Sequence, residues 1–113
     1  SIMEKFLVIY GATPKAMEQW KTQSTEEGEK DMKRWMDWMG ENATHLVDPG
    51  NPIGKNTRLH VDGTSEEKTN ELCGYLILQA NDRTHAIEIL KSSPHTQNWE
   101  MYIELMNIVD MEM

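Results

Sequence analysis

The segment spanning residues 72–80 constrains the fold most, because its pattern is that of a β-strand with two apolar faces. Its side chains alternate between two sets, Leu76, Leu78 and Ala80 against Tyr75, Ile77 and Gln79. The upstream dipeptide Asp62-Gly63 adopts positive φ readily and predicts a chain reversal before this strand. A strand that is apolar on both faces needs cover on both sides. A chain of 113 residues has few elements to provide it.

The composition is that of a single globular domain covering residues 1–113. Hydrophobic residues make up 38% and charged residues 27% of the chain, which is ordinary for such proteins. We interpret Ser1 and Ile2 as a possible remnant ahead of Met3 as the initiator. A net charge of −8 repels phosphate backbones, so we expect no nucleic-acid partner.

The apolar runs and the cysteine content indicate a cytoplasmic protein without a membrane partner. The longest runs, residues 6–10 and 75–78, are far too short to span a bilayer. The single cysteine, Cys73, excludes an internal disulfide and is typical of a reducing compartment. Its position inside an apolar strand favours an inert core thiol over a nucleophile.

The order of the predicted elements indicates an α+β fold. Thr13, Ser24 and Asp82 each precede a helical pattern as an N-cap. The predicted strands cover residues 5–10, 44–48, 57–61, 72–80 and 101–109, and the predicted helices start at residues 14, 25 and 83. Two strand–helix units that return to one antiparallel sheet predict a ferredoxin-like sandwich with its helices on one face.

Two local patterns refine this prediction. Met32, Trp35, Met36 and Met39 recur at helical spacing and predict the core-facing side of the long helix, which we expect to end at Gly40. Trp38 lies off this stripe, at the flank of the core or against a partner. The cluster at residues 49–52 combines two prolines with glycine and asparagine and predicts a turn.

The helices can cover only one sheet face, so we expect the other face to stack on a second copy of the chain. We assign to this second face a mixed set of apolar and polar groups that resembles the wall of a small-molecule cavity: Tyr10, Tyr75, Gln79, Tyr102 and Glu104. The alternative is that these tyrosines pack in the dimer interface without a ligand.

The turn and strand motifs together resemble the YCII-related family, also called the DGPF-domain family. The resemblance rests on the strand at residues 6–11, the segment 45–52, Asp62-Gly63 with Gly74-Tyr75, and Pro94-His95. It covers nearly the whole chain through the order and spacing of individually weak motifs. It implies a ferredoxin-like fold that dimerises sheet to sheet, as in the dimeric α/β-barrel superfamily.

The resemblance also bears on catalysis. One family member is a dehydrochlorinase acting on a chlorinated hydroxyquinol, and some members have a proposed His-Asp acid/base pair. Here Thr64-Ser65 replace the Pro-Phe of the signature, the long helix carries no histidine, and Ser93 stands in place of the aspartate. The resemblance therefore does not supply that pair.

The histidines leave three interpretations open. We expect His45 and His60 to lie close together on neighbouring short strands, with Asp48 and Asp62 at the strand ends. Such groups fit acid/base work, a divalent metal, or simple surface positions. The spacing is not that of a metal site, so we assign no metal and no cofactor. His95, which the resemblance places at a cleft rim, is the best single catalytic candidate.

Two functions follow from these patterns. The first is a homodimeric module that binds a small molecule in a cleft between sheet and partner, using Tyr10, His45, Tyr75, Tyr102 and Glu104. The second is a small-molecule lyase or isomerase, dehydrochlorinase-like, in which His95, His60 and Asp62 supply acid/base chemistry. The absence of a histidine from the long helix favours the first function.

Overall fold

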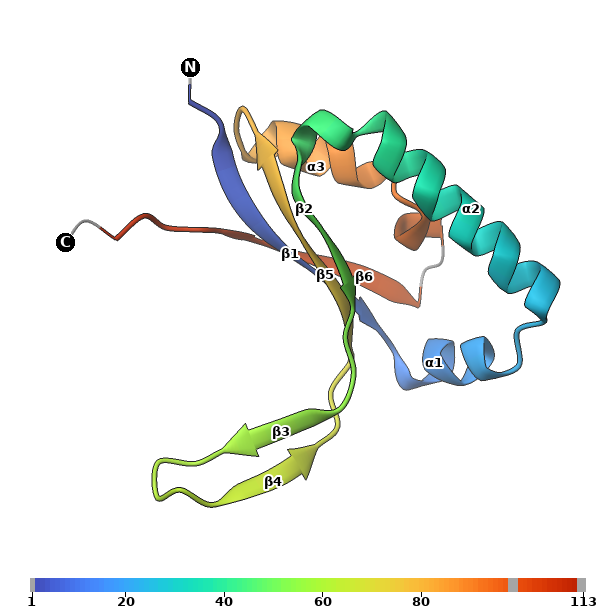
Figure 1. Ribbon diagram of the computed structural model, residues 1–113, viewed down its shortest axis with the longest axis vertical. Helices are drawn as coiled ribbons and strands as arrows, with labels where there is room; N and C mark the ends of the chain where they lie inside the picture. The colour runs from blue at the N-terminus through green and yellow to red at the C-terminus, as the bar shows by residue number, and fades with distance from the viewer. Residues whose placement is uncertain (1, 98–99, 112–113) are drawn as a thin grey trace.

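The computed structural model describes residues 2–97 and 100–111, and shows one antiparallel sheet with helices on a single face (Figure 1). Ser1 of the possible remnant lies outside the described residues. The sheet has the order β2-β5-β1-β6. Its strands are β1 (Glu4–Ala12), β2 (Leu46–Pro52), β5 (Leu72–Ala80) and β6 (Met101–Asn107). The predicted ferredoxin-like α+β fold is confirmed.

The helices connect the outer strands to the centre of the sheet. They are α1 (Pro14–Lys21), α2 (Thr25–Glu41) and α3 (Arg83–Lys91), joined by the short 3-10 turns η1 (Ala43–His45) and η2 (Pro94–Gln97). The crossover through α1 and α2 brings β2 to the far side of β5, and α3 leads from β5 to β6. A separate hairpin, β3 (Asn56–Leu59) with β4 (Ser65–Lys68), is inserted between β2 and β5.

The three predicted N-caps are confirmed. Thr13 Oγ1 accepts from the Ala16 N–H at 3.3 Å, and Ser24 Oγ accepts from the Glu27 N–H at 3.2 Å. Asp82 Oδ1 accepts from the His85 N–H at 2.8 Å. Each bond satisfies one of the backbone donors that a helix leaves unpaired at its start.

The core lies between the sheet and the helices. It combines Phe6, Val8 and Tyr10 from β1, Leu76, Leu78 and Ala80 from β5, and Trp38, Ala86, Ile89 and Leu90 from the helices. The placement of Tyr10 with the other tyrosines was wrong. The register pairs Tyr10 with Gly74 and Ile103, so its ring shares the helix-covered face.

The packing of α2 also differs from the prediction. Met32 and Met36 are 59% and 61% exposed, whereas Trp38 is buried. Trp38 packs edge-on against Trp35 with a centroid distance of 6.0 Å, and its indole N–H donates to Ser92 Oγ at 3.1 Å. The two tryptophans, three residues apart, therefore define the buried side of α2. Its end at Glu41 lies one residue beyond the predicted stop at Gly40.

The predicted turn at residues 49–52 is part of β2, which continues through Pro52 as an edge strand with two register shifts against β5. Prolines are tolerated there because an edge strand has one unpaired side. Gly50 permits the irregularity, since its φ is +74°. A Cβ at this position would lie 1.6 Å from the Tyr75 carbonyl oxygen.

We expect the variant Gly50→Ala to lower the free energy of unfolding by about 3 kcal/mol or more, because the methyl group would push β2 off β5. Urea unfolding followed by circular dichroism measures this change. Gly40→Ala in α2 is the matched control, since a Cβ there meets nothing within 4 Å. It should leave stability unchanged or raise it by up to about 1 kcal/mol. Equal midpoints for Gly50→Ala and wild type would contradict the close approach.

Candidate functional site

A cleft of about 630 Å³ opens on the helical side of the molecule, where α1 and the start of α2 face η2 and β6. This volume lies in the range typical of small-molecule sites. Its apolar walls come from Trp20, Trp35 and Met101, and His95 also lines it. Its other lining residues are mostly polar or charged: Gln19, Thr22, Gln23, Glu27, Lys30, Asp31, Arg34 and Pro94.

A small polar network in the cleft joins Asp31 and Arg34, two of its four charged lining residues. Asp31 is the centre of this network, because its carboxylate accepts from Gln23 Nε2 at 2.6 Å and forms an ion pair with Arg34. Lys30 lies 3.4 Å from Glu26 on the outer side of α2. Cations and carboxylates alternate along one wall, so the cleft offers donors and acceptors without a strong net charge.

His95 forms the inner wall of the cleft and is only 5% exposed. Its Nε2 lies 2.7 Å from the Gly11 carbonyl oxygen, so we assign the proton to this nitrogen. The ring lies 4.8 Å from Tyr10 and 6.4 Å from Trp35, measured between centroids. Burial lowers the pKa of His95, and its contacts with the Gly11 and Tyr102 backbone offset only part of this effect. The imidazole is therefore neutral at neutral pH.

Two buried hydroxyls lie beside this wall. Among the described residues, neither the Tyr10 hydroxyl nor the Ser93 hydroxyl has a hydrogen-bond partner of good geometry. Burial raises the pKa of Tyr10, an effect that the nearby Ser93 hydroxyl partly offsets. The phenol therefore stays protonated. The Tyr10 ring also packs edge-on against Trp35, at 5.2 Å between centroids.

Tyr75, Tyr102 and Glu104 lie on the opposite face of the sheet, as predicted from their alternation. The Tyr102 ring covers Gly11, since a Cβ on Gly11 would lie 2.2 Å from it. The Tyr102 hydroxyl donates to Glu71 Oε1 at 2.9 Å, and this bond is the main cause of its raised pKa. These residues are separated from His95 and the cleft by the sheet itself.

His45 is placed apart from both groups. Its Nδ1 lies 3.2 Å from the Gln79 carbonyl oxygen, and its ring packs edge-on against His85 at 5.1 Å. The expectation that His45 and His60 lie close together was wrong, because β3 belongs to the separate hairpin and not to the main sheet.

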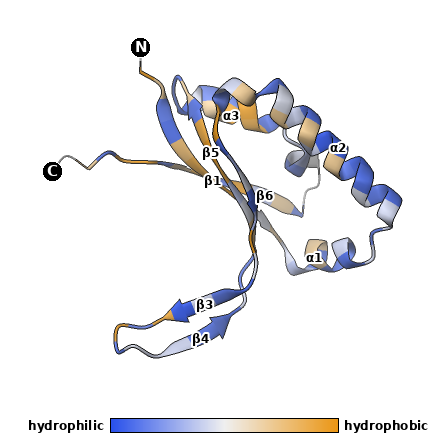
Figure 2. Ribbon diagram, viewed as in Figure 1, coloured by the Kyte–Doolittle hydropathy of each residue, from blue (hydrophilic) through white to orange (hydrophobic). Residues whose placement is uncertain are grey.

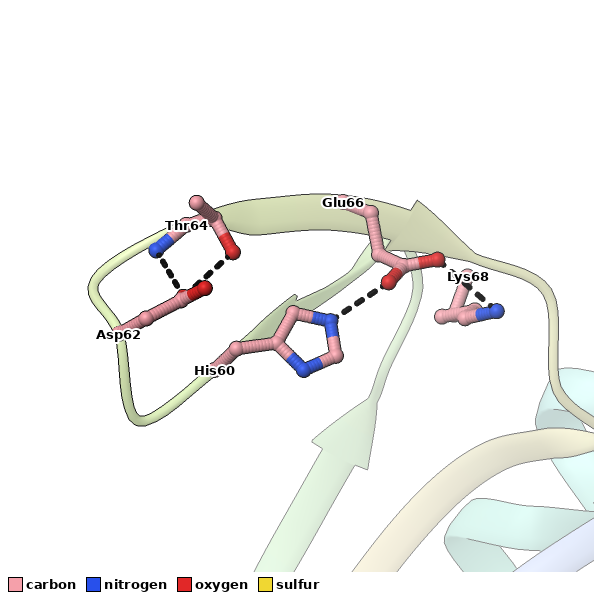
Figure 3. A network of polar contacts seen from close by, with 5 residues as sticks. All are labelled: His60, Asp62, Thr64, Glu66 and Lys68. Atoms are coloured by element: carbon pink, nitrogen blue, oxygen red, sulfur yellow. Dashed lines mark hydrogen bonds and ion pairs between the residues drawn. The ribbon is translucent and has the colours of Figure 1, made fainter.

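His60 and Asp62 lie at the end of this hairpin (Figure 3). His60 Nε2 is 2.5 Å from a Glu66 carboxylate oxygen, and Asp62 accepts from the Thr64 backbone and hydroxyl. The hairpin places them away from His95 (Figure 1). The three candidate catalytic residues therefore do not form one constellation within a single chain.

Trp20, Trp35 and Arg34 are the cleft residues that sequence reasoning missed. Trp35 was assigned to the core because of its helical spacing. The available signal was the polar sequence around them, including Gln19, Gln23 and Asp31, which a fully buried helix face would not carry.

Cys73 matches the prediction of an inert thiol. It is half-buried, its Sγ donates to the Tyr10 carbonyl oxygen at 3.3 Å, and burial raises its pKa. Within residues 2–97 and 100–111, no group of three His, Cys, Asp or Glu side chains could hold a metal ion. None of the described helices combines the length and apolarity needed to cross a membrane.

No protein-family model matches the chain, and no curated protein matches it.

We expect His95 to make folding pH-dependent. Since its pKa is lowered in the folded state, the unfolded chain binds a proton first as the pH falls. The stability is fully present above the ordinary histidine pKa of about 6.5 and is lost below it. Urea unfolding at pH 7.5 and 5.5 measures this loss, and it should be smaller in His95→Gln, which cannot take up the proton. An equal loss in both proteins would contradict a buried neutral imidazole.

Proposed function

We propose that this chain is a small-molecule binding protein whose ligand occupies the cleft beside His95. The observation that carries the proposal is the cleft itself: a concavity of about 630 Å³ lined by two tryptophans and by a neutral imidazole that lies near one of them. Such a mixture binds planar ligands well, because aromatic walls contribute apolar area while a few polar groups orient the ligand. We place the ligand on the helical side rather than between sheet and partner, since this concavity exists in one copy.

The geometry supports binding better than the alternative lyase or isomerase activity. A general base needs a free acceptor atom within reach of the substrate. His95 is only 5% exposed and its ring is held by the bond from Nε2 to the Gly11 carbonyl, so little of it reaches a substrate in the cleft, and His60 is paired with Glu66 on the hairpin. Asp31, the carboxylate at the centre of the cleft, is held by Gln23 and Arg34. We therefore assign His95 a positioning role in the cleft wall.

Thermal unfolding with planar probes tests the binding proposal. We expect at least one of catechol, salicylate and coumarin to raise the melting temperature and to quench tryptophan fluorescence, since ligands stabilise the state that binds them. Trp20→Ala, which removes one wall of the cleft, should weaken this binding about tenfold.

Met36→Ala is the control, because Met36 lies on α2, is 61% exposed and does not line the cleft. Unchanged melting temperatures with all three probes would count against a planar ligand. An equal affinity in Trp20→Ala and Met36→Ala would place the ligand elsewhere.

We further propose that the chain is a homodimer formed through the face of the sheet that no helix covers (Figure 1). The chain exposes 8279 Å², whereas a compact monomer of 13.1 kDa exposes about 6,400 Å². Its radius of gyration is 16.0 Å, against about 13 Å for a compact domain of this length. The excess surface, roughly 1,900 Å², is about twice what one partner contributes to a standard interface.

The uncovered face has the composition that such an interface needs. Its central residues are apolar and half-buried, namely Leu7 and Ile9 from β1 and Tyr75 and Ile77 from β5. Hydrophobic residues dominate both strands in Figure 2. Polar groups such as Glu104 on β6 lie at one edge of this apolar centre. An apolar centre with a polar rim is the usual anatomy of a protein interface.

We expect Ile77→Asp to raise the dimer dissociation constant at least about hundredfold, because it would place a carboxylate in the middle of the apolar face. Sedimentation velocity over a range of concentrations measures this constant. Ile87→Asp is the matched control: Ile87 is 42% exposed on α3, on the helical side of the sheet. A monomeric wild-type protein at micromolar concentration would contradict the dimer.

Membership of the YCII-related family stays part of this proposal. The strand order and the Asp62-Gly63 reversal before β5 support it. We propose a cytoplasmic location for the same protein, supported by its single, half-buried thiol at Cys73.

A further inference from the structure

The hairpin of residues 56–68, here called the arm, is the least integrated part of the fold. In the described part of the chain, β3 and β4 pair with each other and with no strand of the main sheet. The arm stands away from the end of that sheet and projects toward the side that the helices leave open (Figure 1). Isolated two-stranded hairpins are marginal in water, so an arm of this kind gains from packing on another surface.

One face of the arm is held by its own polar contacts (Figure 3). Glu66 accepts from His60 Nε2 at 2.5 Å and pairs with Lys68 Nζ at 2.9 Å. These two contacts lower the pKa of Glu66, Lys68 being the larger cause. At the tip, Asp62 Oδ1 accepts from the Thr64 N–H at 2.9 Å. The arm therefore has a defined shape without help from the rest of the chain.

Two apolar side chains lie exposed near the tip of the other face of the arm, which also carries Glu67 nearer its base. Leu59 is opposite Ser65 in the register, on the side away from Glu66, and it is 74% exposed. Val61 follows at the start of the turn and is completely exposed. Two large exposed apolar side chains near the tip of a projecting hairpin are typical of an interaction surface.

We infer that the arm is an intersubunit clasp, in which Leu59 and Val61 pack on a second copy of the chain. This inference rests on the proposed homodimer and adds a second contact region to it. A second copy fits best because the arm projects on the same side as the uncovered sheet face, so one docked copy meets both surfaces (Figure 1). In a two-fold dimer each arm would contact the opposite copy, so both arms would bury surface in the interface.

The charge pattern of the arm agrees with this arrangement. Leu59 and Val61 would enter the interface, while His60, Glu66 and Lys68 on the opposite face would stay in water as part of the rim. These ionic contacts already satisfy one another within the arm. When Leu59 and Val61 dock, the charged groups on the opposite face therefore keep their partners within the arm.

The double variant Leu59→Asp/Val61→Asp tests the inference in the full chain. We expect its dimer dissociation constant, measured by sedimentation velocity, to rise about hundredfold with an unchanged circular dichroism spectrum. The control is Met36→Asp/Ile87→Asp, which makes the same charge change on exposed apolar residues of the helices. This control should keep the wild-type constant within about threefold.

The outcomes separate the two proposals. A monomeric wild-type protein overturns the dimer and the clasp together. A wild-type dimer that the arm variant leaves unchanged overturns the clasp alone, while Ile77→Asp still tests the sheet face.

A photo-crosslinking residue at position 61, in an equal mixture of 14N- and 15N-labelled protein, supplies a second readout. The clasp predicts crosslinked dimers of mixed isotope content. Crosslinks confined to single chains would overturn it.

Discussion

The rest of the fold depends on strand β1, because it lies inside the main sheet and joins β5 to β6. It pairs with β5 along one edge and with β6 along the other, so two of the three strand pairings of the main sheet involve it. Phe6 and Val8 are fully buried under the helices, whereas Leu7 and Ile9 point to the side without helices. The same strand therefore contributes both to the buried core and to the sheet face that no helix covers.

Much of the fold could be predicted from the sequence where the signal is local. An N-cap acts over three residues, so Thr13, Ser24 and Asp82 identified the helix starts without knowledge of the tertiary structure. The alternation within β5 likewise separated Leu76 and Leu78 from Tyr75 and Ile77. These patterns sufficed for the order of the helices and the main-sheet strands and for the ferredoxin-like topology, although strand β4 of the hairpin was not predicted.

The errors arose where contacts distant in sequence decide the outcome. Pro49 and Gly50 form a turn in most contexts, but pairing with β5 holds them in an edge strand. Alternation divides a strand into two sets without saying which set meets the helices, and so Tyr10 was assigned to the wrong face. Helical spacing put Met36 in the core, whereas the packing of α2 on the sheet buries Trp38 and leaves Met36 61% exposed.

Single residues of the candidate site could be predicted from the sequence, but their grouping in space could not. His95 was the best single candidate, and it lines a cleft on the helical side, which differs from the predicted cleft between sheet and partner. Its grouping with His60 failed, since the spatial position of the arm depends on a hairpin whose second strand was not predicted. The tryptophans of the cleft were invisible as site residues because helical spacing is the same for a core and for a cleft wall.

The cleft and the uncovered sheet face meet at Gly11, which explains how one thin sheet can carry two surfaces. From the helical side, His95 donates to the Gly11 carbonyl oxygen at 2.7 Å. From the other side, the Tyr102 ring occupies the space that a Cβ would need, at 2.2 Å. A glycine is therefore required for the ring to lie flat on the strand while the carbonyl holds the cleft wall. A Cβ at this position would require the Tyr102 ring to move, so the uncovered face and the cleft wall depend on the same residue.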